Sequence, residues 1–190
     1  MDPDIELIHL LKEGDESALK ELMSRHKQAV FHFVLRFTGN ETDAAELTEE
    51  TFVKVYFGAP KFRPRAKVKT WIFTIASNLC KDHFRKHKKR RLESLDSINS
   101  EEGRSSLYDQ VPSGEQSADD EASTNELEGF LHEQIRALPE KLRVPFIHCV
   151  LEEESHEDCA QVLGTTSKTV ETRIYRARKK LKAAMDLRFG

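Results

Sequence analysis

Two helical patterns joined by one tight turn lie within residues 155–181, and this arrangement constrains the fold most. Ser155 can cap the first helix, and Asp158 follows three residues later in the order of a capping box. Gly164 suits the left-handed backbone position that ends a helix, and Thr166 can cap the next one. We therefore expect two helices joined by a short, glycine-containing turn.

The second helical pattern has one apolar stripe, and its other faces are mainly polar and basic. The apolar residues recur at spacings of four, three and four, so they can pack on Ala160 and Leu163 of the first helix. This is the layout of a helix-turn-helix that reads duplex DNA, in which residues near the helix start reach base edges and later cations hold phosphates. A solvated basic helix without a partner is the alternative. The stripe comprises Val170, Ile174, Ala177 and Leu181, and the candidate DNA contacts are Thr166, Ser167, Lys168, Thr169, Glu171, Thr172, Arg173, Tyr175, Arg176 and Lys179.

Helical periodicity also dominates the rest of the chain, and no strand alternation stands out, so we predict an all-α fold. Asp15 should cap the second helix, and Gly39 should end it. Ala45 should face the core, and Pro145 should kink its helix or delay its start. The predicted helices cover residues 5–11, 18–37, 42–57, 70–91, 125–137 and 139–152, and residues 58–69 form an irregular basic loop.

The charges fall into three blocks. Residues 1–92 carry 18 Lys and Arg against 13 Asp and Glu, residues 93–128 carry one against 11, and residues 129–190 carry 11 against nine. The stretch 93–125 is rich in Ser, Gly, Asp and Glu, which is the composition of a flexible linker. Its negative charge could cover a basic DNA-binding surface until DNA displaces it, although a plain solubilising tether is the simpler interpretation.

The bulk composition favours a cytoplasmic protein of one or two domains. At 190 residues the chain can bury a core. No run of about 20 apolar residues is present, so no membrane span is predicted. The acidic N-terminus lacks the apolar stretch of a signal peptide. An odd number of cysteines without close pairing fits a reducing compartment.

Two cysteine patterns leave alternatives open. Cys80, His83 and His87 lie on one helical face, but zinc needs a fourth ligand and none is obvious nearby, so a partly buried helix surface fits better. Cys149 and Cys159 could form a redox-sensing pair, although no feature of the sequence indicates a lowered pKa there. We predict no metal and no cofactor.

Acidic residues cluster within residues 43–52, on the exposed side of a predicted helix. Clustered carboxylates can support general acid–base chemistry, but no nucleophile, metal-ligand set or phosphate cradle accompanies them. A solvated face or a protein-docking face fits better, and we do not expect an enzyme.

Residues 61–71 combine five cations with Phe62 and Trp71. Cations follow phosphates and aromatic rings stack on unpaired bases, which together are what single-stranded nucleic acid requires. Asn78 in the following helix can read a base edge. The alternative is that Trp71 and Phe73 are core residues beside solvated cations.

Four segments in sequence order now carry a family resemblance. They are D-A-A-E-L-T-E-E-T-F, then F-R-P-R-A-K-V-K-T-W-I-F-T-I-A-S-N-L-C-K-D-H-F-R, then L-P-E-K-L-R-V-P-F, and the helix-turn-helix with its R-A-R-K-K-L tail. Together they resemble a bacterial RNA polymerase sigma factor of the extracytoplasmic-function (ECF) subfamily. The resemblance implies a region 2 domain over residues 1–92, a flexible acidic linker over 93–125 and a region 4 helix-turn-helix domain over 126–190.

The resemblance also implies roles. The chain would bind the clamp helices and flap of core polymerase, direct promoter-specific initiation, be a monomer when free and meet an anti-sigma factor. The alternatives are a regulator that binds duplex DNA without polymerase, and a protein that sequesters polymerase or another sigma factor. Core binding would involve Asp43, Glu46, Leu47, Glu49, Glu50 and Phe52; the −10 element would meet Lys61, Phe62, Arg63, Arg65, Lys67, Lys69, Trp71, Ser77, Asn78, Lys81 and Arg85; the −35 element would meet the candidates from Thr166 to Lys179.

The sequence departs from the family pattern in several places. Pro64-Arg65 replaces a Gly-Glu pair that is frequent in the loop, so the base preference there can differ. Residues 152–154, Glu-Glu-Glu, replace a more apolar turn before the helix-turn-helix. His156, Cys159, Thr165 and Glu171 also depart from the usual residue types, which predicts an altered −35 preference.

Overall fold

The computed structural model describes the backbone of residues 2–64, 66–97 and 118–190, and the side chains of these residues apart from 88–97 and 118–125. Every regular element in them is helical, which confirms the all-α prediction. Among these residues, no helix combines the length and the hydropathy that crossing a membrane requires.

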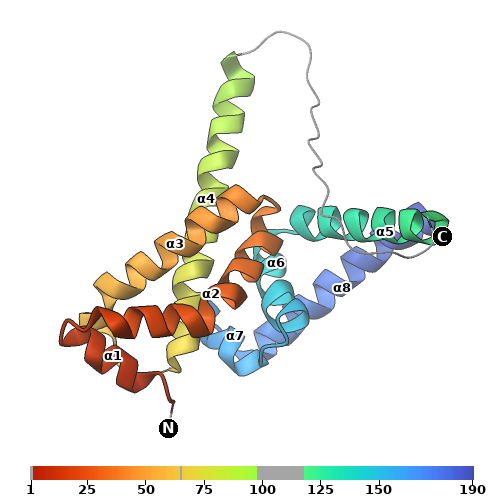
Figure 1. Ribbon diagram of the computed structural model, residues 1–190. Helices are drawn as coiled ribbons and strands as arrows, with labels where there is room; N and C mark the ends of the chain where they lie inside the picture. Colours follow the sequence, from red (N-terminus) through yellow and green to blue (C-terminus); the bar gives the residue numbers. More distant parts are fainter. Residues whose placement is uncertain (1, 65, 98–117) are drawn as a thin grey trace.

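The N-terminal helices begin and end where local signals predict. Asp15 Oδ1 accepts a hydrogen bond from Ser17 N at 2.8 Å and so caps the second helix. Gly39 ends that helix in a left-handed conformation with φ of 70°. Asn40 Oδ1 accepts from Asp43 N at 2.9 Å and caps the third. The elements are α1 (Ile5–Lys12), α2 (Glu16–Thr38), α3 (Glu41–Gly58), the 3₁₀ turn η1 (Ala59–Lys61) and α4 (Val68–Ser97) (Figure 1).

Pro145 lies inside a helix that starts at Glu140, so the predicted late start does not occur, and the predicted kink stays a prediction. Proline cannot donate to the helical ladder, and the α-helix ends at Phe146, the next residue, where a π-helical segment follows. Glu152 N donates to Ile147 O at 3.0 Å, which is the five-residue spacing of a π-helix. The C-terminal elements are α5 (Ala118–Ala137), α6 (Glu140–Phe146), the π segment η2 (Ile147–Leu151), α7 (His156–Leu163) and α8 (Ser167–Phe189).

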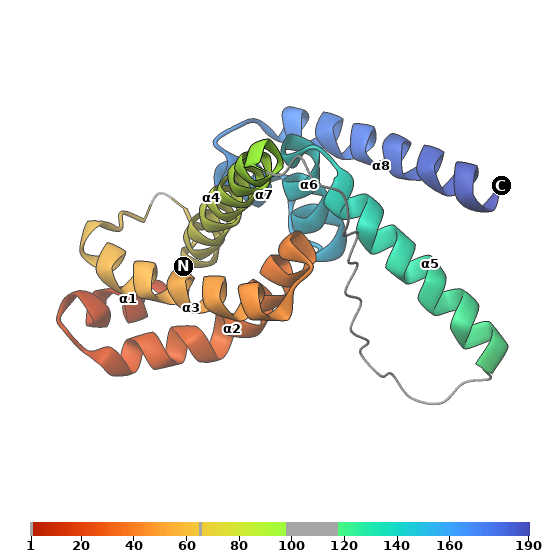
Figure 2. The ribbon, with the colours of Figure 1, turned by 90° about the horizontal axis from the view of Figure 1, so that it is seen from above.

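One apolar core joins the two halves of the chain. Phe33 of α2 and Phe73 of α4 are buried and pack edge to face, with ring centroids 5.5 Å apart. Val144 and Ile147 from the C-terminal half belong to the same cluster. Viewed from above, α2 and α3 lie on one side of α4, and α6, α7 and α8 lie on the other (Figure 2). Buried apolar surface is the main stabilising contribution to folding, so this seam holds the halves in a closed arrangement.

Arg143 reinforces the seam with a buried cation. Its guanidinium lies 4.7 Å from the ring centroid of Phe37 and 4.5 Å from that of Phe84. It also donates hydrogen bonds to Phe37 O at 3.4 Å and to Leu138 O at 3.2 and 3.3 Å. Burial lowers the pKa of Arg143, but a guanidinium keeps its charge at neutral pH. The cation therefore links α6 to aromatic rings on α2 and α4.

The last helix extends beyond the helix-turn-helix and pairs with α5. In Figure 1, α8 runs obliquely and reaches α5 near the C-terminus. Arg188 contacts Glu126 at 3.0 Å, and the rings of Phe130 and Phe189 lie 5.4 Å apart. This pairing brings the C-terminal end of the chain back against α5.

The structure differs from the sequence predictions in two details. Ala45 is exposed, and Ala44 is fully buried instead, because the buried stripe of α3 runs through Ala44, Thr48 and Val55. Helix α4 continues to Ser97 and α5 starts at Ala118, so both helices enter the predicted linker, since a charged composition does not prevent helix formation. The predicted boundaries of the two domains stay a prediction.

Candidate nucleic-acid interface

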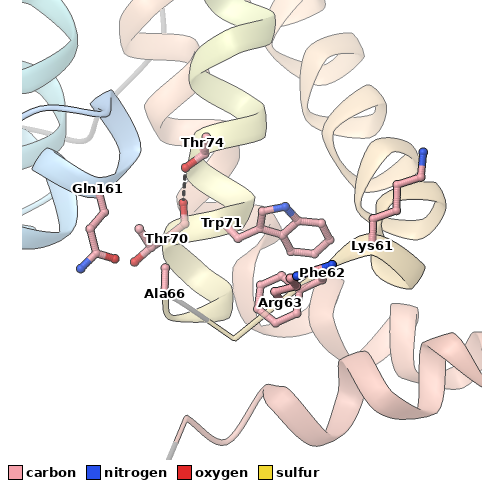
Figure 3. Close-up of a pocket in the computed structure, with 8 residues that line it drawn as sticks. All are labelled: Lys61, Phe62, Arg63, Ala66, Thr70, Trp71, Thr74 and Gln161. Carbon is pink, nitrogen blue, oxygen red and sulfur yellow. Dashed lines mark hydrogen bonds between the residues drawn. The ribbon is translucent and has the colours of Figure 1, made fainter.

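A pocket of about 400 Å³ opens between the basic loop and the start of α4 (Figure 3). The rings of Phe62 and Trp71 tilt against each other in it, with centroids 4.8 Å apart. A Cβ on Gly58 would come within 3.1 Å of the Trp71 ring, so the glycine leaves room for the indole. Trp71 is only half-buried and contributes ring surface to the pocket. The lining residues are Lys61, Phe62, Arg63, Ala66, Thr70, Trp71, Thr74 and Gln161.

The two ends of the loop are tied to the N-terminal segment. Lys12 Nζ donates a hydrogen bond to Phe62 O at 3.1 Å. Val68 N donates to Asp2 Oδ2 at 2.6 Å, so Asp2 satisfies one of the free N–H groups at the start of α4. Sequence reasoning missed both contacts, because neither residue is near the loop in sequence.

The residues predicted to meet the −10 element differ in exposure. Phe62 is only 8% exposed, and its ring contacts Trp71. Ser77 is fully buried, and its Oγ has no hydrogen-bond partner among the described residues. Arg65 lies outside the described residues. The exposed members are Lys61, Arg63, Lys67, Asn78 and Arg85, and the half-buried members are Lys69, Trp71 and Lys81.

Carboxylates of the C-terminal half pair with cations of the basic loop. Lys67 Nζ lies 3.0 Å from Asp158 Oδ2, and Lys69 pairs with Glu154. Thr70 Oγ1 donates to Asp158 Oδ1 at 3.2 Å. Arg36 of α2 likewise pairs with Glu152. The acidic turn at residues 152–154 thus faces the basic loop, a pairing that the opposite charges of the two segments could have indicated.

Asp158 takes part both in the cap of α7 and in the ion pair with Lys67. Its N–H donates to Ser155 Oγ at 3.0 Å, as the predicted cap requires, and its carboxylate accepts from Ser155 Oγ at 2.8 Å. Burial acts to raise the pKa of Asp158, but hydrogen bonds from Ser155, Lys67 and Thr70 outweigh it and hold this pKa below its ordinary value. The hydrogen bond to Asp158 raises the pKa of Lys67. Both groups are therefore charged at neutral pH.

The helix-turn-helix forms as predicted. Gly164 ends α7 with φ of 59°, and Thr166 Oγ1 caps α8 by accepting from Thr169 N at 3.2 Å. Val170 and Ile174 are buried in one cluster with Ala160. The exposed candidates for duplex contact are Thr166, Lys168, Glu171, Thr172, Tyr175, Arg176 and Lys179, and the half-buried ones are Ser167, Thr169 and Arg173.

The predicted docking helix has a carboxylate face and a buried face. Glu46, Glu49 and Glu50 are exposed, and Asp43 is half-buried. Leu47 and Phe52 are only 5% and 2% exposed and belong to the core. The same helix also exposes two large apolar side chains, Val53 and Phe57, which sequence reasoning did not single out.

The structure changes the interpretation of both cysteine patterns. Cys80 is buried, which raises the pKa of its thiol to about 12, and it does not join His83 and His87. Those histidines lie with Asp43 instead. The structure gives Cys149 a lowered pKa that the sequence did not indicate. The Cys159 thiol, and then His148, lower the pKa of Cys149 to about 6 against the effect of burial.

Two family models match separate parts of the chain. Residues 22–90 match the Sigma-70 region 2 family, and residues 131–181 match the Sigma-70, region 4 family. The first match contains α3, the basic loop and the pocket, and the second contains the helix-turn-helix.

Curated relatives have sigma-factor names. The chain is 29% identical to ECF RNA polymerase sigma factor SigE of Mycolicibacterium smegmatis, over 89% of this chain and 63% of SigE. It is 27% identical to the RNA polymerase sigma-H factor of Pseudomonas aeruginosa, over 96% of this chain and 94% of that protein. It is also 27% identical to ECF RNA polymerase sigma factor SigW of Bacillus subtilis, over 92% of each.

Solved structures share the fold. CnrH, solved in complex with the cytosolic domain of CnrY, superposes with a TM-score of 0.70 at 24% identity and covers 99% of both chains. Sigma factor RpoE of Bartonella quintana, solved with the anti-sigma factor NepR, gives a TM-score of 0.65 at 21% identity, over 89% of this chain and 97% of RpoE. With both sigma regions present and ECF factors among its relatives, the chain belongs to the ECF-type RNA polymerase sigma factors, which direct promoter-specific transcription initiation and are not enzymes.

Proposed function

We propose that the region 2 pocket captures an unpaired base of the −10 element while the exposed face of α8 reads the −35 element. The observation that carries this division of work is the pocket formed by Phe62 and Trp71 beside exposed cations on the same chain as a capped, basic reading helix. Base–aromatic stacking contributes about 1–3 kcal/mol per base. A captured base would therefore stabilise locally melted DNA without chemistry by this chain.

Cations around the pocket supply the second part of −10 binding. Lys61 and Arg63 are exposed at its edge, and Asn78 and Arg85 are exposed along the following helix. Phosphate contacts position the strand, and Asn78 can read a base edge. Lys67 and Lys69 would join them once their carboxylate partners are displaced.

For −35 binding, the first turns of α8 would enter the major groove. Lys168, Glu171 and Thr172 are exposed near its N-terminal end, where a recognition helix contacts base edges. Arg176 and Lys179 follow on exposed positions and suit phosphate contacts.

Core polymerase would dock on α3. The exposed carboxylates Glu46, Glu49 and Glu50 give this helix a negative face, and Val53 and Phe57 add apolar contact area beside it. Exposed apolar side chains rimmed by polar ones are typical of interaction sites. Since core polymerase acts in the cytoplasm, a cytoplasmic location belongs to this proposal. An anti-sigma factor is a further proposed partner, because RpoE of Bartonella quintana was solved with one.

The proposal is tested by combining the purified chain with core polymerase and mapping transcription starts across genomic DNA. We expect starts that share sequence motifs near −35 and −10 and that disappear when the chain is omitted. Core binding without promoter opening would indicate a sequestering protein instead. Sequence-specific duplex binding without any affinity for core would indicate an ordinary regulator.

A further inference from the structure

Three potential metal ligands meet where the helix-turn-helix packs on region 2. His148 and Cys149 are adjacent in the π segment, and Cys159 lies on α7. One ring nitrogen of His148 and the two Sγ atoms all lie within 4.8 Å of one another. Cys159 is fully buried and Cys149 is half-buried. π-helical segments occur often at functional sites, and here the segment brings two consecutive side chains to one point.

The histidine of this cluster has unsatisfied nitrogens. His148 is 2% exposed, and its ring packs edge-on against Phe33 and Phe73, with centroids 5.9 and 5.2 Å away. Neither Nδ1 nor Nε2 has a hydrogen-bond partner among the described residues. A buried polar atom without a partner is costly and needs an explanation. A metal ion bound to one of these nitrogens would provide it.

We propose that His148, Cys149 and Cys159 bind one soft or borderline divalent metal ion, with Zn²⁺ as the best match. Two thiolates and one imidazole are the donors that Zn²⁺ takes in proteins. Tetrahedral zinc holds such donors roughly 3.5–3.8 Å apart, so small side-chain rotations would complete the site.

The fourth coordination position would be filled by water or by His156, the first residue of α7, whose side chain is exposed. The ion would join the π segment directly to α7. Since α7 is the first helix of the helix-turn-helix, metal binding would stabilise region 4 and its contact with Phe33 and Phe73 of region 2.

The described residues contain a second cluster of potential metal ligands, and any test must distinguish it from the proposed site. Asp43, His83 and His87 also bring their ligand atoms within 4.8 Å. His87 is exposed, and His83 Nε2 already lies 3.6 Å from Asp43 Oδ2, so this group resembles an ordinary surface contact. His87→Ala removes it without changing any thiol.

The test uses the full chain, reduced and freed of metal, with Zn²⁺ titrated against a chromophoric chelator and Co²⁺ used as a spectroscopic probe. We expect one Zn²⁺ per chain, a thiolate-to-Co²⁺ charge-transfer band and a rise in melting temperature with Zn²⁺. Cys149→Ser and Cys159→Ala should each weaken binding at least about tenfold and remove the band. Cys80→Ala and His87→Ala are the matched controls and should retain it. His156→Ala should weaken binding only if its imidazole is the fourth ligand.

Three outcomes would overturn the proposal. In the first, the reduced chain takes up no Zn²⁺ although circular dichroism shows that it is folded. In the second, Zn²⁺ uptake is unchanged in Cys149→Ser. In the third, Cys149 and Cys159 form a disulfide in air while the reduced chain binds no metal. None of these measurements involves polymerase or DNA, so the result is independent of the proposed promoter function.

Discussion

Lys67 Nζ of the basic loop contacts Asp158 Oδ2 of the helix-turn-helix at 3.0 Å. A cation assigned to −10 DNA is therefore paired with a carboxylate of the domain assigned to −35 DNA. While this pair persists, Asp158 neutralises the positive charge that Lys67 would offer to a phosphate. In this arrangement Asp158 and Glu154 pair with Lys67 and Lys69, two cations that the proposed function gives to −10 DNA.

Weakening the ion pair between Lys67 and Asp158 should favour separation of the N-terminal half of the chain from the C-terminal half. Asp158→Asn removes the charge but keeps a side chain that can accept hydrogen bonds, so we expect more open molecules and tighter binding of a −10 single strand by the free chain. Ion pairs with an exposed partner contribute little because solvent screens them, so the gain should be at most a few-fold. Fluorescence anisotropy measures it, and Glu157→Gln, an exposed neighbour without an ion pair among the described residues, is the control.

The pair also predicts a pH dependence. Because the pKa of Asp158 is lowered in the folded chain, its stabilisation is present above the ordinary Asp value of about 3.9 and is lost as pH falls through the lowered pKa. Because the pKa of Lys67 is raised, its contribution is present below about 10.4 and is lost as pH rises through the raised pKa. Energy transfer between labels on the two halves should show a plateau over roughly pH 5 to 9. Asp158→Asn should flatten the acid limb, and an unchanged acid limb would contradict the assignment.

Charge reversal on α3 should weaken docking to core polymerase. Glu49→Lys with Glu50→Lys places like charges against whatever cations the exposed carboxylates meet, and such contacts cost several kcal/mol. We expect a loss of affinity of at least about tenfold in a pull-down. Glu133→Lys, an exposed carboxylate on α5, should leave binding intact. Equal losses in both variants would argue against a specific surface on α3.

Removing the pocket's indole should impair promoter melting. Trp71→Ala deletes one of the two rings that can stack on an unpaired base, a loss of about 1–3 kcal/mol. Trp71→Phe retains a ring and should recover part of the effect. Permanganate reactivity of unpaired thymines measures opening in the polymerase complex, and duplex −35 binding should be unaffected in both variants.

Removing a cation from the exposed face of α8 should weaken DNA binding in a salt-dependent way. Arg176→Ala should weaken −35 binding and reduce the magnitude of the salt slope by about 1 if a phosphate contact is lost. Lys182→Ala, an exposed cation further along α8, is the control. A slope unchanged in Arg176→Ala would mean that this side chain does not contact the backbone.

Local sequence signals predicted the local structure well. The caps at Asp15, Ser155 and Thr166 and the left-handed ends at Gly39 and Gly164 all depend on contacts within a few residues. Such contacts can be identified from the sequence alone.

Contacts between distant segments could not be predicted in the same way. Asp158 and Lys67 are 91 residues apart in the sequence. Each also has a sufficient local explanation, Asp158 as part of a helix cap and Lys67 as a residue of a basic loop, so the sequence did not indicate that they pair. The burial of Ser77 depends on how α4 packs against α2 and α3, which the helix period of one element does not determine. His148 gave no sequence signal, because its meeting with Cys159 depends on the π segment after Pro145.

The buried Arg143 between Phe37 and Phe84 has a consequence for promoter selection. Opening the halves would break this aromatic contact as well as the surface ion pairs, so we expect the open form to be a minority state of the free chain. The apparent affinity of a ligand falls in proportion to the fraction of competent molecules: if one molecule in about a hundred is open, promoter binding weakens about a hundredfold. The contact of Arg143 with the two rings would then set how strongly the closed form is favoured. The chain would bind DNA only after polymerase has shifted the equilibrium toward the open form.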